Sequence, residues 1–511
     1  MEKIIVKNSC IMITDYHKGE CTKIENIFKI YDRISFKAYE FGSYYDEDNY
    51  ILYLPRIDVW YLQRETGLAK SDVIIERTCD EYEYISGLEL KVAPRDDFQK
   101  EALRFCTGNG EYKQNAGMPQ LGLSLTTGKG KTYVSIATAS YYEMKTIVIT
   151  YSVGWLEQWK ERIKDYTNLS DRDIYMISGS ASINRILKSG KDDHKIYLVT
   201  HSTITTFANK YGWDKITQLF LNLKVGIKII DEAHLNFVNV SMIDFFTNTF
   251  KTYYLTATPA RSSEEENNIY GLYFKNVPSI NLFDEEIDPH TKYIALKFNS
   301  HPSVYDIQEC KNAYGLDRNR YIDYLTKRPV FDYILYVILD LAIKAGGKCL
   351  IYIGTNSAIK YTYHWINMHF PELSGDVGIF TTLVDKVQKE KEKDKRIILS
   401  TTKSAGAAMD IKGLKLTIVL DEPFKSHVLA QQSLGRTRDD NTYYIECVDM
   451  GFKQIIKYYN YKLPIFQKYA LSCSEMPMRQ EELEVRANII LNNIPKKSII
   501  SRSVIQHYDE D

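Results

Sequence analysis

Short apolar runs alternate with longer amphipathic stretches from residue 91 onward. The short runs are typical of buried strands, and the stretches between them have the length of helices. Strands that alternate with helices predict parallel, doubly wound sheets of the α/β class, with ligands at the carboxyl ends of the strands. The predicted strands are Thr146–Thr150, Ile196–Thr200, Val225–Ile230 and Tyr253–Leu255 in a first series, then Cys349–Ile353, Val377–Phe380, Ile397–Leu399, Leu416–Leu420 and Tyr443–Cys447 in a second.

The segments outside these two series indicate how the chain is divided. Lys3–Val6, Ile51–Leu54 and Val59–Leu62 carry β-forming residues, typical of strands in a small α+β accessory domain. Helices are predicted over Pro329–Lys344 and, in a charged tail, over Glu481–Asn493. The predicted domains are residues 1–90 (accessory), 91–285 (first α/β domain), 286–330 (linker and connecting segment), 331–470 (second α/β domain) and 471–511 (C-terminal helical tail).

The stretch Leu121–Thr132, LGLSLTTGKGKT, is typical of a strand that turns through a phosphate-binding loop into a helix. Its glycines let backbone amides approach phosphate oxygens, Lys131 can reach the β- and γ-phosphates, and the Thr132 hydroxyl can ligate Mg²⁺. A Gly-rich turn is the alternative, because Leu125 occupies the position of the usual first glycine. The predicted nucleotide-binding residues are Thr127, Gly128, Lys129, Gly130, Lys131 and Thr132, and the predicted helix is Lys131–Tyr142.

Two adjacent acids, Asp231 and Glu232, follow the predicted strand Val225–Ile230 in the sequence DEAH. Carboxylates at the end of a buried strand are costly unless they serve a cation or a solvated site. Beside a phosphate-binding loop, Asp231 suits Mg²⁺ ligation, and Glu232 suits orienting and deprotonating a water that attacks the γ-phosphate. The alternative is an acidic helix cap. The spacing of about 100 residues from the loop favours the catalytic interpretation.

Two arginines, Arg436 and Arg438, lie in the sequence QQSLGRTR near the end of the second series. An arginine on a second domain can act as a finger that neutralises charge as the γ-phosphate departs. The alternative is a basic helix end in solvent. A further apolar strand that ends in hydroxyls, Tyr254–Pro259 (YLTATP), precedes them.

Taken in order, GKGKT, DEAH, TATP and a late QxxGR resemble the motifs of superfamily 2 helicases and translocases, from about Arg95 to about Val448. The resemblance implies two RecA-like lobes in tandem, ATP and Mg²⁺ as cofactors, and ATP hydrolysis coupled to translocation along nucleic acid or to its unwinding. It also implies nucleotide contacts by Gln99, which would read adenine, and by Gly406, Asp410 and Gln432.

The same resemblance implies a set of contacts with the phosphates of one nucleic-acid strand, largely without reading bases. Strand-end solvation is the alternative for each of these residues. The family usually spaces its last arginines as GRxxR, whereas Asp439 stands at the second position here, so which arginine is the finger stays open. The predicted nucleic-acid contacts are Ser152, Thr200, His201, Ser202, Thr355, Asn356 and Thr401.

Within the superfamily, Tyr50–Arg56 (YILYLPR) resembles the N-terminal region of phage UvsW-type recombination helicases. That resemblance implies single-stranded, forked or branched duplex DNA as the partner, an accessory domain that binds DNA, and a role in recombination, repair or replication, alongside proteins of those processes. An RNA helicase is one alternative. An ATP-switched nucleic-acid-binding assembly protein, from another class, is the second.

The net charge, the cysteines and the N-terminal sequence each narrow the possible partners and location of the protein. The formal net charge of −1 means that nucleic-acid binding must rely on local basic patches. The eight cysteines show no CxxC or Cys/His zinc spacing, which is typical of free thiols in a reducing compartment. The N-terminus is too polar for a signal peptide, and no apolar run is long enough to span a membrane. We therefore expect a cytoplasmic protein, in the host cytoplasm if the chain is phage-encoded, without a membrane partner.

Overall fold

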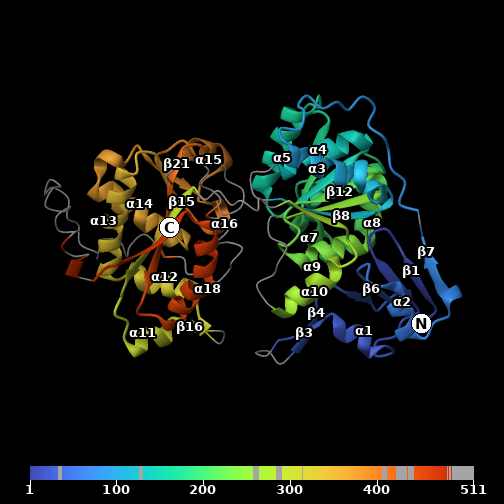
Figure 1. The fold of residues 1–511 in the computed structure, drawn as a ribbon, viewed down its shortest axis with the longest axis horizontal. Coiled ribbons are helices and arrows are strands. Elements are labelled where there is room, and N and C mark those ends of the chain that lie inside the picture. The colour runs from blue at the N-terminus through green and yellow to red at the C-terminus, as the bar shows by residue number, and fades with distance from the viewer. Residues whose placement is uncertain are drawn as a thin grey trace. The chain divides into compact units, whose positions relative to one another are not determined.

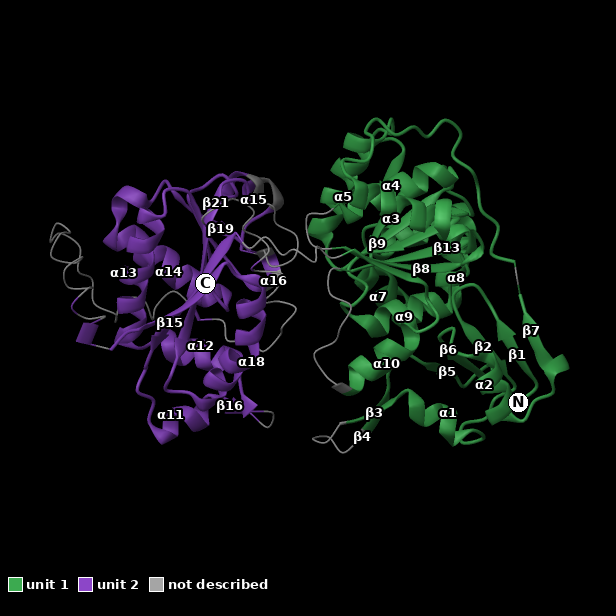
Figure 2. Ribbon diagram, in the orientation of Figure 1, with its two compact units in different colours: residues 1–285 green, residues 286–511 purple. Residues whose placement is uncertain are grey.

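The computed structural model describes residues 1–32, 37–76, 78–125, 130–256, 264–282, 290–312, 315–381, 383–405, 411–421, 434, 442–479, 481–482 and 485. The chain divides into two compact units, Met1–Glu285 (unit 1) and Glu286–Asp511 (unit 2), which are green and purple in Figure 2. Each unit has its own sheets and its own apolar core. Among the described helices, none combines the length and the hydropathy that a membrane crossing needs.

Unit 1 begins with a small mixed sheet, formed by the residues for which an accessory domain is predicted and hereafter called the accessory domain. Its strands are β1 (Lys3–Val6), β2 (Ile11–Thr14), β5 (Tyr44–Asp46), β6 (Ile51–Leu54) and β7 (Val73–Ile75), in the order β5-β6-β2-β1-β7. A separate hairpin pairs β3 (Lys29–Asp32) with β4 (Lys37–Glu40), and the helices are α1 (Thr22–Ile27) and α2 (Val59–Thr66).

The segment Val59–Leu62, which resembles a strand in sequence, lies in helix α2 instead. The Asp58 side chain caps this helix by accepting hydrogen bonds from the amides of Trp60 and Tyr61. Gly67 ends it in the left-handed conformation. These two end signals outweigh the strand preference of valine and the aromatic residues between them.

The accessory domain shares an apolar core with the helices that follow the DEAH sequence. Phe41 lies 5.2 Å from Phe237, measured between ring centroids, and both rings are buried. The same core contains Ile24 and Phe28 from the accessory domain and Tyr273 from the α/β part. The accessory domain is therefore packed into unit 1 rather than tethered to it.

The α/β part of unit 1 is a parallel sheet that contains the first predicted series and two strands that were not predicted, Ile174–Met176 and Ser279–Leu282. Its strands are β8 (Gln120–Leu125), β9 (Thr146–Thr150), β10 (Ile174–Met176), β11 (Ile196–Thr200), β12 (Ile227–Ile230), β13 (Lys251–Thr256) and β14 (Ser279–Leu282). They lie in the order β10-β11-β9-β12-β13-β8-β14, and the central strands are buried along their whole length. Burial on both faces is what parallel strands covered by helices require.

Two apolar cores lie on opposite faces of this sheet. Val148 of β9 belongs to one core, with residues of α3, α4 and α5, whereas its neighbours Ile147 and Ile149 belong to the other, with α6, α7 and α8. Figure 1 shows α3, α4 and α5 on one side of the sheet and α7 and α9 on the other. The helices are α3 (Asp97–Thr107), α4 (Lys131–Tyr142), α5 (Val153–Tyr166), α6 (Gly179–Ser189), α7 (His201–Tyr211), α8 (Asp214–Leu223), α9 (Phe237–Phe245) and α10 (Glu264–Phe274).

Unit 2 is built on a second parallel sheet, which contains the second predicted series. Its strands are β15 (Thr291–Phe298), β18 (Lys348–Tyr352), β19 (Val377–Phe380), β20 (Ile397–Ser400), β21 (Leu414–Val419), β22 (Thr442–Asp449) and β23 (Ser472–Pro477), in the order β19-β20-β18-β21-β22-β15-β23. A short hairpin joins β16 (Lys311–Asn312) and β17 (Gly315–Leu316). The helices are α11 (Val304–Glu309), α12 (Arg318–Thr326), α13 (Pro329–Lys344), α14 (Asn356–His369), α15 (Lys386–Glu392), α16 (Thr402–Ala405) and α18 (Lys453–Tyr469).

Two strands of this sheet come from segments outside the predicted second α/β domain. β15 lies in residues 286–330, the predicted connecting segment, and β23 lies in the predicted helical tail. β15 pairs with β22 on one side and with β23 on the other. Most of the predicted helix Glu481–Asn493 falls outside the described residues.

Candidate active site and nucleic-acid interface

The carboxyl edge of the first sheet collects the predicted site residues of unit 1. β11, β9, β12, β13 and β8 are consecutive neighbours, and each predicted motif follows or ends one of them. Thr200 ends β11, Ser152 follows β9, Asp231 follows β12, Thr256 ends β13, and Gly130 follows β8. Because the strands are parallel, these residues meet at one edge.

Lys131 and Glu232 form an ion pair at this edge. Lys131 is the first residue of α4, and its Nζ lies 3.4 Å from Glu232 Oε1. The two side chains are only 12% and 14% exposed, so the pair is held largely away from bulk water. A mostly buried lysine at a helix N-terminus suits the binding of a phosphate group.

Gly130, directly before α4, has a φ of 93° and is approached closely by Gln99. A Cβ at Gly130 would lie 2.2 Å from Gln99 Nε2 and would displace that side chain, and the positive φ itself favours glycine. Gln99 is buried, and its Oε1 accepts a hydrogen bond from the Arg95 amide at 2.8 Å. The structure therefore places the predicted adenine-reading residue against the end of the predicted loop, while Thr127, Gly128 and Lys129 lie outside the described residues.

Asp231 is oriented by a tryptophan that the sequence analysis did not single out. Trp159 Nε1 donates a hydrogen bond of 2.8 Å to Asp231 Oδ2. Burial, together with the neighbouring charge of Glu232, raises the pKa of Asp231 to about 6. Trp159 lies on the buried face of α5, one turn after Trp155, and only the fold reveals that its N–H reaches the carboxylate.

The raised pKa of Asp231 predicts a pH dependence of stability in the absence of nucleotide. Between the unfolded value of about 4 and the folded value of about 6, the folded chain binds more protons, so stability falls as pH rises through this window and then levels off. The variant Asp231→Asn should lose this fall. Urea unfolding of both proteins at pH 5 and pH 7.5 measures the difference, and parallel changes in the two proteins would contradict the assignment.

Glu232, His234 and Thr256 form a contact chain between the DEAH sequence and β13. Glu232 Oε2 lies 3.3 Å from His234 Nδ1, and Thr256 Oγ1 lies 2.9 Å from the same nitrogen. Glu232 has a φ of 49°, in the left-handed region that residues with a side chain rarely adopt. Backbone in such a conformation persists where surrounding contacts hold it, as often happens at functional sites.

The predicted nucleic-acid contacts of unit 1 divide into accessible and buried residues. Ser202 is exposed and Ser152 is partly exposed, whereas Thr200 and His201 are buried. Thr200 caps α7 by accepting a hydrogen bond of 3.2 Å from the Thr203 amide. His201 Nδ1 lies 3.3 Å from Asn239 Nδ2 of α9. Ser202 and Ser152 therefore reach solvent, with the Ser202 hydroxyl 3.0 Å from Thr200 Oγ1, whereas Thr200 and His201 are buried at the same edge.

In unit 2 the predicted contacts follow two adjacent strands. Tyr352 of β18 pairs with Ser400 of β20, so Thr355 and Thr401 follow neighbouring strand ends. Thr355 caps α14 by accepting a hydrogen bond from the Ala358 amide, and Thr401 accepts one from the Ser404 amide, at 3.2 Å and 3.0 Å. Asn356 is the first residue of α14. Gly406, Asp410, Gln432, Arg436 and Arg438 lie outside the described residues.

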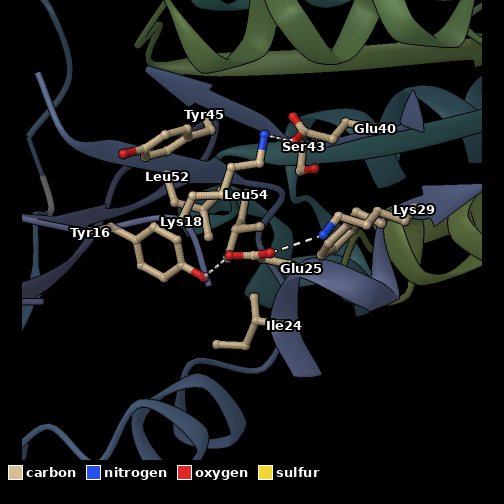
Figure 3. Close-up of a pocket in the computed structure, with 11 residues that line it drawn as sticks. Tyr16, Lys18, Ile24, Glu25, Lys29, Glu40, Ser43, Tyr45, Leu52 and Leu54 are labelled. Atoms are coloured by element: carbon tan, nitrogen blue, oxygen red, sulfur yellow. Dashed lines mark hydrogen bonds and ion pairs between the residues drawn. The ribbon is translucent and has the colours of Figure 1, made fainter. Parts of the chain in front are cut away.

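A small pocket in the accessory domain is a structural cluster rather than a second site (Figure 3). Its central carboxylate, Glu25, accepts hydrogen bonds from the Tyr16 hydroxyl and Lys29 Nζ, each at 2.9 Å, and from the Gly19 amide. Burial opposes ionisation here, but these hydrogen bonds outweigh it and hold the pKa of Glu25 below its usual value. The glutamate is already satisfied by neighbours of its own domain.

Comparisons with known proteins agree with the motif order. Residues 92–261 match the family model described as type III restriction enzyme, res subunit. The transcript termination protein A18 of Yaba-like disease virus is 25% identical over 356 residues, which cover 66% of this chain and 69% of that protein. A putative DNA 3′-5′ helicase Rad25 of Haloarcula marismortui is 27% identical over 186 residues, 36% of this chain and 26% of that protein. The matches thus span from about two thirds to about a quarter of these relatives.

Solved structures confirm the predicted fold class. A fragment of a putative HsdR subunit of a type I restriction enzyme from Vibrio vulnificus YJ016 aligns over 89% of this chain and 79% of that chain, with a TM-score of 0.52 and 15% identity. At this identity the likeness concerns the fold alone: two RecA-like parallel-sheet lobes in tandem after a small N-terminal α+β domain. With the match over residues 92–261 and the named relatives, the chain is an ATPase of the helicase and translocase kind, similar to proteins that carry the superfamily 2 motifs.

Proposed function

We propose that this ATPase is a DNA helicase or translocase that acts on forked or branched DNA in recombination, repair or replication. The observation that carries the proposal is the shared sheet edge, which holds both the Lys131–Glu232 pair and two residues that reach solvent, Ser152 and Ser202. The relative that is named a putative DNA 3′-5′ helicase supports DNA as the substrate. The resemblance of Tyr50–Arg56 to UvsW-type helicases supports forked or branched DNA.

The residues at the edge fit a magnesium nucleotide. Asp231 is a partly buried carboxylate whose ionised form is disfavoured by desolvation and by Glu232, so a bound cation would favour that form. Mg²⁺ usually binds through one or two carboxylates together with substrate phosphates, and among the described residues no cluster of three His, Cys, Asp or Glu could hold a metal alone. Asp231 and Thr132 would hold the ion, which supplies neutralisation of phosphate charge when bound.

In this proposal Lys131 and Glu232 take separate roles once a γ-phosphate is present. The lysine contacts the phosphate, and the carboxylate orients and deprotonates the attacking water. Glu232 contacts His234, which contacts Thr256 at the end of β13. Loss of the γ-phosphate beside Glu232 would therefore affect the position of the end of β13 through these contacts. The guanidinium group of Arg436 or Arg438 would add positive charge at the γ-phosphate, as the resemblance implies.

The choice of DNA over RNA is tested by ATPase stimulation. Contacts with phosphates discriminate poorly between the two, so a preference must come from the sugar or from the geometry of the substrate. We expect steady-state ATP hydrolysis by the full chain to rise more with forked DNA than with single-stranded RNA of matched length. Stimulation by RNA alone would overturn the choice of substrate in favour of an RNA helicase.

A further inference from the structure

Tyr151 presents an aromatic ring between two helix N-termini at the carboxyl edge of the first sheet. It directly follows β9, and its ring centroid lies 5.9 Å from that of Trp155 in α5 and 5.4 Å from that of His201 in α7. Tyr151 is 38% exposed, whereas Trp155 and His201 are 5% and 3% exposed. The ring is therefore supported from within the protein by two buried rings and remains accessible to solvent.

We propose that Tyr151 is a stacking platform for an unpaired nucleobase of the strand whose phosphates Ser152 and Ser202 contact. This proposal rests on the function proposed above. Helix N-termini and hydroxyls favour phosphate, and an adjacent aromatic face favours a base, which is the combination found where proteins grip single strands. The contacts with Trp155 and His201 restrict the ring before a base arrives, so stacking costs little additional side-chain entropy.

His201 contributes to this platform as a neutral ring. Its burial lowers the pKa to about 4, so the imidazole carries no charge at neutral pH and supports Tyr151 without attracting phosphate. His201 Nδ1 lies beside Asn239, while Nε2 has no hydrogen-bond partner in the part of the chain that the structure describes. The imidazole is thus buried behind the Tyr151 ring and supports it by packing rather than by contact with a ligand.

Stacking predicts a preference that phosphate contacts alone do not give. In a duplex the base faces are covered by their neighbours, whereas an unpaired strand exposes them. Tyr151 should therefore favour single-stranded over fully paired DNA, and it should favour a strand with bases over the same sugar–phosphate backbone without them.

The test compares the binding of a labelled oligothymidylate with that of an abasic strand of equal length, by fluorescence anisotropy of the full chain. Tyr151→Ala should weaken binding to the oligothymidylate by about 5- to 100-fold and leave binding to the abasic strand unchanged. Tyr151→Phe should bind both strands like the wild type. Tyr211→Ala is the matched control, because Tyr211 is 41% exposed at the opposite end of α7, with its ring 4.6 Å from Phe207.

Three outcomes would overturn either the stacking role of Tyr151 or the proposed function. Equal losses by Tyr151→Ala on both strands, or no loss on either, would remove the stacking role while the function stands. A wild type that binds neither strand would remove the proposed function itself. If the alanine variant does not fold, Tyr151→Leu decides the question, since leucine keeps apolar volume against Trp155 and lacks an aromatic face.

Discussion

Replacing Glu232 with glutamine is expected to lower the steady-state ATP turnover of the full chain by at least about 100-fold. The amide keeps the size of the side chain but cannot accept a proton from the attacking water. In the structure Glu232 Oε1 lies 3.4 Å from Lys131 Nζ, and Oε2 lies 3.3 Å from His234 Nδ1. A phosphate-release assay with and without nucleic acid measures the loss.

The controls separate chemistry from binding. Glu232→Gln should still bind a fluorescent ATP analogue, whereas Lys131→Ala should lose turnover through loss of phosphate contact. Glu161→Gln, the same substitution at an exposed position of α5, should hydrolyse ATP at the wild-type rate. A Glu232→Gln protein with wild-type turnover would contradict the role of this carboxylate.

The second large effect is a loss of stability, expected on substitution of Asp244, which belongs to a buried polar network beneath the carboxyl edge of the sheet. Asp244 Oδ1 lies 2.7 Å from Lys228 Nζ, both side chains are fully buried, and Asp244 Oδ2 accepts hydrogen bonds of 2.7 Å from the hydroxyls of Tyr254 and Tyr273. Lys228 is in β12, three residues before Asp231, and Tyr254 is in β13. The network therefore ties together the two strands that carry the DEAH and TATP sequences.

Asp244→Asn should destabilise unit 1 by about 3–5 kcal/mol, because it leaves the Lys228 charge buried without a counter-charge. Four of the five tryptophans, Trp60, Trp155, Trp159 and Trp213, lie in unit 1, so tryptophan fluorescence during urea unfolding reports mainly on this unit. The double variant Lys228→Met with Asp244→Leu should be more stable than Asp244→Asn, because it removes both charges. An Asp244→Asn protein with the wild-type unfolding midpoint would show that the network contributes little.

Much of the fold could be predicted because the decisive signals are local. The helices over Lys131–Tyr142 and Pro329–Lys344 have the predicted bounds, since a glycine precedes the first and a proline begins the second. β15 and β23 could not be assigned in the same way. β15 finds its partners β22 and β23 more than a hundred residues later, and no local pattern records such pairing.

The site shows the same division between local and long-range information. The polar residues at the strand ends predicted that the site lies at the carboxyl edge of the sheet, because parallel strands bring their carboxyl ends together. The bond from Trp159 to Asp231 and the contact of His234 with Thr256 depend on packing between distant segments. The burial of His201 likewise depends on α9 and on Tyr151, which a motif comparison does not report.

ATP-driven movement along nucleic acid is tested most directly by one comparison. The wild type and Glu232→Gln are each incubated with labelled forked DNA, with RNA of matched length or without nucleic acid, in the presence and absence of ATP. Hydrolysis is followed in every reaction, and strand displacement in the reactions with the fork. The wild type is expected to hydrolyse ATP faster on the fork than alone and to displace the labelled strand only with ATP, and Glu232→Gln is expected to do neither. Hydrolysis by the wild type that no DNA or RNA stimulates, with no displacement, would contradict the motor and favour an ATP-switched assembly protein.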